Sequence, residues 1–183
     1  MALKSTIYKA ELNVADIDRH YYADHSLTLA RHPSETDERM MVRLAAFALF
    51  ADPALAFCKG LSDTAEADLW QTDLTGAVSH WIEVGLPDER SIAKASGRAT
   101  RVSIFAYGGN AAAMWWKQNE GKLSRFANLD VIRLDQESTR ALARLAERTM
   151  RLQATIQSGE LMLSSDSAQV VVVPERLQDL RPR

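Results

Sequence analysis

Two acidic residues, Asp68 and Glu83, lie in a stretch that can bring their carboxylates together. Two short apolar runs flank Asp73-Leu-Thr-Gly76, which has the residue types of a turn. The second run, from Val78 to Val84, alternates apolar and polar side chains. Alternation with a period of two is typical of a strand, so residues 66–85 are predicted to form an antiparallel hairpin.

The register of this hairpin decides whether the two acids can act together. An even loop centred between Leu74 and Thr75 would place Asp68 opposite Trp81, with Asp68 and Glu83 as diagonal neighbours on one face, roughly 7–8 Å apart at the backbone. An odd loop would put the two acids on opposite faces. In the shared-face register both carboxylates could bind one Mg²⁺ or Mn²⁺, because such ions take hard oxygen ligands. Without a cation the carboxylates would repel, so metal is expected to stabilise the fold.

Cleavage of a phosphodiester would also need a cationic side chain near the acids. Lys94 lies in a short helix predicted over residues 88–99, and it could orient the attacking water or stabilise a pentavalent phosphate. Acid pairs on the solvent face of a hairpin are also common, and in that interpretation they carry no chemistry. The chain has no phosphate-binding glycine loop, dinucleotide fingerprint or Gly-x-Ser-x-Gly motif.

Composition is that of an ordinary globular protein. The 183 residues are 46% hydrophobic and 25% charged, with a formal net charge of -2. This balance gives no overall attraction to nucleic acid, although it allows a local basic patch. A single cysteine, Cys58, excludes an intrachain disulfide and is expected to be a small buried hydrophobe. There is no signal-peptide run and no stretch of roughly 18 apolar residues, so a cytoplasmic protein without a membrane partner is expected.

The order of the predicted elements indicates one mixed α/β domain over residues 1–174 with a loose C-terminal tail over 175–183. Two strands come first, within 3–14 and 21–29. A helix follows from Ser34 to Phe50, with acids in its first turn. The hairpin and then alternating helices and strands complete the chain. We expect a central mixed sheet flanked by helices.

Four segments of the chain resemble the YaeQ family: Met1–Ala10, Ser26–Met41, Trp81–Arg90 and Arg148–Gln157. The resemblance extends nearly from end to end. It implies a small bacterial cytoplasmic protein of a family without an assigned activity. It also implies a restriction endonuclease-like fold, similar to the PD-(D/E)xK nucleases, in which adjacent strands present one acid and then Asp/Glu-x-Lys.

Carried over by this resemblance, Asp68 stands for the first acid and Glu83 for the second. Glu38 resembles a helix acid that some such nucleases add to the metal site. The position two after Glu83 is Gly85 instead of lysine. The resemblance therefore implies that Lys94, on the neighbouring helix, supplies the missing cation.

Two hypotheses about function follow. In the first, the chain is a metal-dependent phosphodiesterase of nucleic acid, with Mg²⁺ or Mn²⁺ on the acids and with Arg90, Arg98 and Arg101 on the phosphate backbone. In the second, it is a non-catalytic binding or regulatory module derived from the same fold. The shared face of the acids favours the first hypothesis, whereas Gly85 and the slightly acidic charge favour the second.

Overall fold

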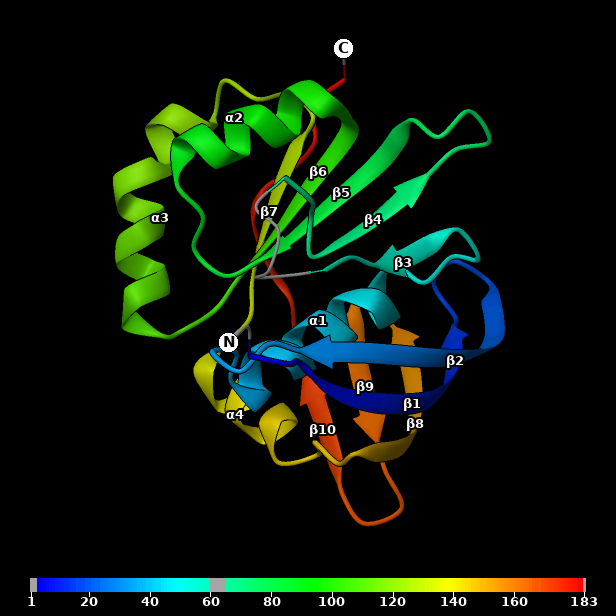
Figure 1. Ribbon diagram of the computed structural model, residues 1–183. Helices are drawn as coiled ribbons and strands as arrows, with labels where there is room; N and C mark the ends of the chain where they lie inside the picture. Colours follow the sequence, from blue (N-terminus) through cyan, green and yellow to red (C-terminus); the bar gives the residue numbers. More distant parts are fainter. Residues whose placement is uncertain (1–2, 60–64, 183) are drawn as a thin grey trace.

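The computed structural model describes residues 3–59 and 65–182, which fold as two mixed sheets with a helix between them (Figure 1). Sheet A has the strand order β10-β9-β8-β1-β2, and sheet B has the order β11-β7-β6-β5-β4-β3. The four helices of these ranges are α1 (Asp37–Leu49), α2 (Glu89–Arg98), α3 (Asn110–Leu123) and α4 (Gln136–Ala143). None of them is long and apolar enough to cross a membrane.

Sheet A is built on a long hairpin. Its strands are β1 (Thr6–Asp16), β2 (Tyr21–Arg31), β8 (Thr149–Gln157), β9 (Glu160–Ser164) and β10 (Gln169–Val172). β1 pairs antiparallel with β2 and parallel with β8. Ala10, Leu12 and Val14 of β1 are buried while the residues between them are exposed, so one face of the sheet packs inward. The two strands predicted at the start of the chain are confirmed.

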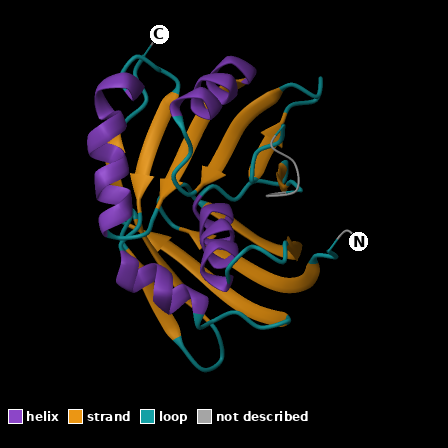
Figure 2. Cartoon of the chain, turned by 60° about the vertical axis from the view of Figure 1, so that its left-hand side comes forward, coloured by secondary structure: helices purple, strands orange, loops and turns teal. Residues whose placement is uncertain are grey.

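Sheet B carries the candidate acids. Its strands are β3 (Leu55–Phe57), β4 (Leu69–Thr72), β5 (Val78–Val84), β6 (Ala99–Ala106), β7 (Leu129–Arg133) and β11 (Glu175–Gln178). β5, β6 and β7 are parallel, and β4 is antiparallel to β5. One face packs against α2 and α3, and the other joins the core that contains α1 and sheet A. Figure 2 shows α1 lying between the two groups of strands.

These arrangements confirm the mixed α/β class and correct two details. The strands form two sheets instead of one central sheet. β1 and β2 pair with β8, and they face α1 from the side opposite the β4–β5 hairpin. The predicted loose tail is partly ordered, since residues 175–178 form β11 and pair with β7. One continuous core contacts both sheets, which is the reason that the two sheets form one unit.

α1 begins later than the sequence predicts. Its N-cap is Thr36, whose side chain accepts a hydrogen bond from the Arg39 N–H, and Asp37 and Glu38 supply the acids of the first turn. Every residue from Met40 to Ala48 is buried, including Arg43, which is only 1% exposed. A helix buried on all sides is expected where it is packed between two sheets.

The β4–β5 hairpin has an odd loop, contrary to expectation. The Asp73 N–H bonds Ala77 O, which closes a three-residue loop, and Gly76 adopts a φ of 85° in it. An odd loop alone would separate the acids. However, the register shifts within the hairpin, where Gln71 pairs with His80 and Thr72 with Val78, so the residue between them bulges.

The bulge restores the shared face with a new register. Leu69 pairs with Ile82, and continuation of this pairing puts Asp68 opposite Glu83. The expected partner of Asp68, Trp81, instead pairs with Trp70. The two acids are therefore direct neighbours across the strands instead of diagonal ones.

The buried Arg43 makes a test of this architecture. Its Nε and Nη2 bond both carboxylate oxygens of Glu35, each at 2.8 Å. We predict that Arg43→Met lowers the free energy of unfolding by about 3–5 kcal/mol, because it leaves a buried carboxylate with fewer partners. The exposed Arg140→Met, on α4, should change it by no more than about 0.5 kcal/mol. Equal urea unfolding midpoints for the two variants would contradict this role of Arg43.

Candidate functional site

Asp68 lies just before β4, beside the carboxyl end of β5, where the parallel strands of sheet B end. Its own N–H donates to Ile82 O at 3.1 Å, which continues the strand pairing. Its Oδ2 accepts the Val84 N–H at 2.8 Å, so the side chain bonds to the end of β5. Asp68 is 3% exposed. The edge outside the carboxyl ends of parallel strands is a common place for binding sites.

Glu83 lies next to Asp68 and is mostly buried. Its Oε1 accepts a hydrogen bond from Trp81 Nε1 at 2.8 Å. Burial, the negative charge of Asp68 and a hydrogen bond between the two carboxyl groups raise the pKa of Glu83 to about 8. At neutral pH Glu83 therefore holds a proton, which it shares with Asp68.

Arg39 of α1 is the cation that faces the acid pair. Its Nη2 donates to Asp68 Oδ1 at 2.7 Å and to Val84 O at 3.2 Å. Its Nη1 donates to Glu35 Oε1 at 2.9 Å. Burial lowers the pKa of Arg39, but the charges and hydrogen bonds of Asp68 and Glu35 outweigh it, and the net pKa lies above the ordinary value. The guanidinium is therefore permanently charged.

The cluster is electrically balanced at neutral pH. Glu35 accepts from both Arg39 and Arg43, and Asp68 accepts from Arg39. Two guanidinium charges thus face two carboxylate charges, while Glu83 is protonated. The neutral balance removes the repulsion that the paired acids would otherwise suffer.

Arg39 and Glu35 were missed by reasoning from the sequence. Glu35, Arg39 and Arg43 are spaced four apart, which is the spacing of charged pairs on a helix face. That pattern could have indicated the ion-pair chain. A helix that began at Ser34 would place Glu35 in its first turn, whereas Glu35 precedes the N-cap, Thr36.

Lys94 does not lie against the acids. It is exposed on α2, whose buried residues are Ile92 and Ala95. Across the described ranges, no ion pair or hydrogen bond joins Lys94 to Asp68 or Glu83. This corrects the expectation that α2 supplies the missing lysine.

Glu38 also departs from its expected role. Its Oε1 accepts a hydrogen bond at 2.7 Å from Thr139 Oγ1 of α4. Among the residues that the structure describes, no three His, Cys, Asp or Glu side chains gather as a metal site, so the set of Glu38, Asp68 and Glu83 is not assembled.

The three arginines expected on a nucleic-acid surface are dispersed. Arg90 is exposed on α2. Arg98 lies over the Trp81 ring, with 5.1 Å from Cζ to the ring centroid. Arg101 forms an ion pair with the buried Asp130 at 2.8 Å. They do not form one basic patch.

Cys58 is a neighbour of the acid pair, and it is half-buried instead of fully buried. Its N–H donates to Asp68 O at 3.0 Å. Burial and the charges of Glu66, Asp68 and Glu83 raise the pKa of its thiol to about 12, so the thiol is not a nucleophile at neutral pH.

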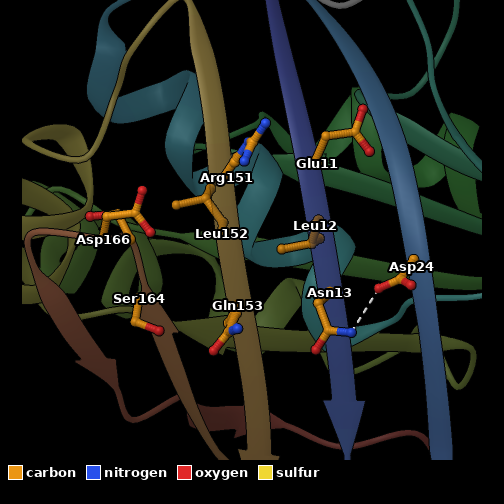
Figure 3. A pocket seen from close by; sticks show the side chains of 10 residues that line it. Glu11, Leu12, Asn13, Asp24, Arg151, Leu152, Gln153, Ser164 and Asp166 are labelled. Atoms are coloured by element: carbon orange, nitrogen blue, oxygen red, sulfur yellow. Dashed lines mark hydrogen bonds between the residues drawn. The ribbon is translucent and has the colours of Figure 1, made fainter.

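One surface hollow lies away from the acids, on the outer face of sheet A (Figure 3). It measures about 470 Å³ and is lined mostly by polar side chains of β1, β2, β8, β9 and the two residues that follow β9. Among these, Asn13 Nδ2 donates to Asp24 Oδ1 at 2.7 Å, as Figure 3 shows. Neither Asp68 nor Glu83 lines this hollow.

Comparison with known proteins gives a consistent family match. The family described as YaeQ protein matches residues 1–174. "Uncharacterized protein YaeQ" of Escherichia coli (strain K12) is 52% identical over 166 residues, which are 91% of this chain and 92% of the relative. The protein of the same description from Salmonella typhi is 52% identical over 164 residues, 90% of this chain and 91% of the relative.

Solved structures agree with the fold over almost the whole chain. The crystal structure of the YaeQ protein from Xanthomonas axonopodis pv. citri has a TM-score of 0.93 at 48% identity, covering 97% of this chain and 99% of that chain. The YaeQ protein from Pseudomonas syringae has a TM-score of 0.92 at 38% identity, covering 97% and 98%.

Ionisation of Glu83 should make stability depend on pH. In the unfolded chain this carboxyl releases its proton near pH 4.5, whereas the folded protein holds it up to about pH 8. The contribution of the protonated Glu83 to the free energy of unfolding is therefore fully present below about pH 4.5. It is lost as the pH rises to about 8, at no more than about 1.4 kcal/mol per pH unit. We predict that Glu83→Gln removes this slope from urea unfolding curves between pH 5 and 8. The control Glu160→Gln, at the exposed first residue of β9, should keep it. Parallel curves for wild type and Glu83→Gln would contradict the shared proton.

Backbone conformation at Gly85 explains why lysine is absent two residues after Glu83. Gly85 has a φ of 118°, which residues with side chains rarely adopt. We predict that Gly85→Lys and Gly85→Ala each lower the free energy of unfolding by about 1–3 kcal/mol, because the strain lies in the backbone. Gly97→Ala, in α2, should be neutral or stabilising. If Gly85→Lys unfolded at the same temperature as the wild type, the backbone would accept a lysine there and this explanation would be wrong.

Proposed function

The chain belongs to the YaeQ family, and from the geometry of its acid pair we propose that it is a non-catalytic binding or regulatory module. The relatives named above are described as uncharacterised, so the proposal rests on this chain's own residues. The single observation that carries it is the position of Arg39.

Arg39 Nη2 contacts Asp68 Oδ1 and Val84 O, which are oxygens that a divalent ion beside the acid pair would need. The guanidinium is fixed by its other contact, with Glu35, which is itself held by Arg43. A divalent ion placed here would face a permanent positive charge at close range. A built-in cation therefore takes the role that a metal has in a hydrolytic site.

The residues present do not fit a resident Mg²⁺ or Mn²⁺ at neutral pH. Glu83 is protonated, and both oxygens of Asp68 accept hydrogen bonds from the chain itself. The lysine position is Gly85, and Lys94 is exposed elsewhere. Arg39 thus lies where the metal of such a centre would bind, and Gly85 stands where its lysine would be.

A metal-dependent phosphodiesterase of nucleic acid is the second candidate. It is favoured by one observation, the position of two carboxyl groups as direct cross-strand neighbours at the ends of parallel strands. For that function, metal would have to displace both the shared proton and the contact with Arg39. The dispersed Arg90, Arg98 and Arg101 give no support to a phosphate-binding surface.

Metal titration separates the two candidates. We predict that millimolar Mn²⁺ or Mg²⁺ leaves the melting temperature of the wild type unchanged near pH 7, and that neither ion supports cleavage of plasmid DNA or single-stranded RNA. Arg39→Gln removes the built-in charge, so this variant should gain metal-dependent stabilisation by mass action, about 2–3 kcal/mol at a hundredfold excess over Kd.

The double variant Arg39→Gln/Glu83→Gln is the matched control and should lose that gain. A wild-type melting temperature that rises with Mn²⁺, together with loss of the rise in Glu83→Gln, would replace the module with the phosphodiesterase.

A further inference from the structure

A second polar cluster lies at the opposite end of α1 from the acid pair, and the proposed function does not use it. It borders a cavity of about 670 Å³, within the range of small-molecule sites. The last turn of α1, at Leu49 and Phe50, forms part of the wall. The rest comes from both sheets and the loops beside them, with Phe105, Ile132 and Ile156 as apolar lining.

A chain of hydrogen bonds fixes His80 at the wall of this cavity. Ser103 Oγ donates its one hydrogen to Asp130 Oδ1, so toward His80 it can only accept. His80 Nε2, 2.8 Å from that oxygen, therefore carries the ring hydrogen. This tautomer leaves Nδ1 as an acceptor that makes no hydrogen bond within the described residues. Burial, together with the charge of Arg101, lowers the pKa of His80 to about 4, so the ring is neutral.

Two arginines share a single buried carboxylate beside His80. Arg101 Nη2 and Arg176 Nη1 both donate to Asp130 Oδ2, at 2.8 and 3.0 Å. Asp130 is fully buried and already accepts the Ser103 hydroxyl, so its oxygens are saturated. The exposed Asp179 lies 3.8 Å from the same Nη1. Within the part of the chain described, Arg101 Nη1 and Arg176 Nε and Nη2 make no hydrogen bond.

The acids on the other wall are mostly occupied. Asp16 accepts from the N–H and Nε of Arg19, and Asp18 accepts the N–H groups of Ser158 and Gly159. Asp52 accepts the Ala54 N–H through Oδ1. Unused donors of Arg101 and Arg176 therefore remain in the cavity, and they lie beside aromatic rings, with Phe50 packed edge-on against His80 at 4.7 Å.

We propose that this cavity binds a small organic anion with a flat apolar body, whose carboxylate or phosphate is bonded by Arg101 and Arg176. The body lies against Phe105 and Ile132, and an O–H or N–H on it donates to His80 Nδ1. Guanidinium groups suit planar or tetrahedral oxyanions because they offer paired donors. The inference gives the binding module a ligand class, and it does not depend on Arg39 or on metal.

Isothermal titration calorimetry with simple probes tests the proposal near pH 7. Benzoate carries a carboxylate and phenyl phosphate carries a phosphate. Whichever binds more tightly shows which of the two head groups the cavity prefers. Benzamide is the neutral isostere of benzoate, and 4-hydroxybenzoate adds a donor. We expect an anion to bind at least tenfold more tightly than benzamide, and Arg176→Gln to weaken that binding about tenfold or more.

Arg176 is half exposed on β11, so Arg176→Gln should fold. The matched control Arg125→Gln, an exposed arginine that pairs with Glu89, should leave the affinity unchanged. Chemical-shift changes in the wild type should centre on Phe50, Phe105 and His80. Equal binding of benzamide and benzoate, unchanged affinity in Arg176→Gln, or no binding of any probe at millimolar concentration would each overturn the proposal. None of these outcomes bears on the acid pair, which is tested with metals.

Discussion

The guanidinium of Arg39, held between Asp68 and Glu35, is the interaction on which the rest of the structure depends. Through it α1 is bound to sheet B, at Asp68 and at Val84 O. Arg43, which shares Glu35 with it, bonds Ala30 O of β2 in sheet A. The two arginines thus join one buried helix to both sheets. Buried charges are tolerated only when paired and hydrogen-bonded, and each of these four charges is.

This constraint also determines what the acid pair can do. Asp68 needs a cation because it is buried, and Arg39 supplies one within the chain. Glu83, buried beside the negative charge of Asp68, is left to hold a proton. An acid pair whose charges and hydrogen bonds are satisfied by other groups of the chain stabilises the fold, whereas a hydrolytic site keeps open positions for metal and substrate. Fold and activity are separate properties, and likeness of fold alone does not assign the activity.

Much of the local structure could be predicted from the sequence, but the long-range arrangement could not. Alternating residues located β1, β2 and β5, and the two acids were correctly expected on one face, although as diagonal neighbours instead of direct ones. The shared face arises in a way that the sequence does not reveal, because the odd loop and the bulge at Ser79 cancel, and Ser79 fits the regular alternation. The contact of Arg39 with Asp68 was missed because two residues 29 positions apart leave no local pattern, even though the spacing of Glu35, Arg39 and Arg43 indicates their own ion pairs. Asp130, a buried acid within an apolar strand, was a visible signal for the second cluster.

Diffraction from crystals soaked in Mn²⁺ near pH 7 tests the central claim most directly, since the anomalous signal of manganese locates the ion without reference to any substrate. With Arg39 as the cation of the acid pair, no anomalous peak should lie between Asp68 and Glu83, and the guanidinium should remain on Asp68 Oδ1. A manganese peak bonded to both carboxylates, with Arg39 displaced, would contradict the account.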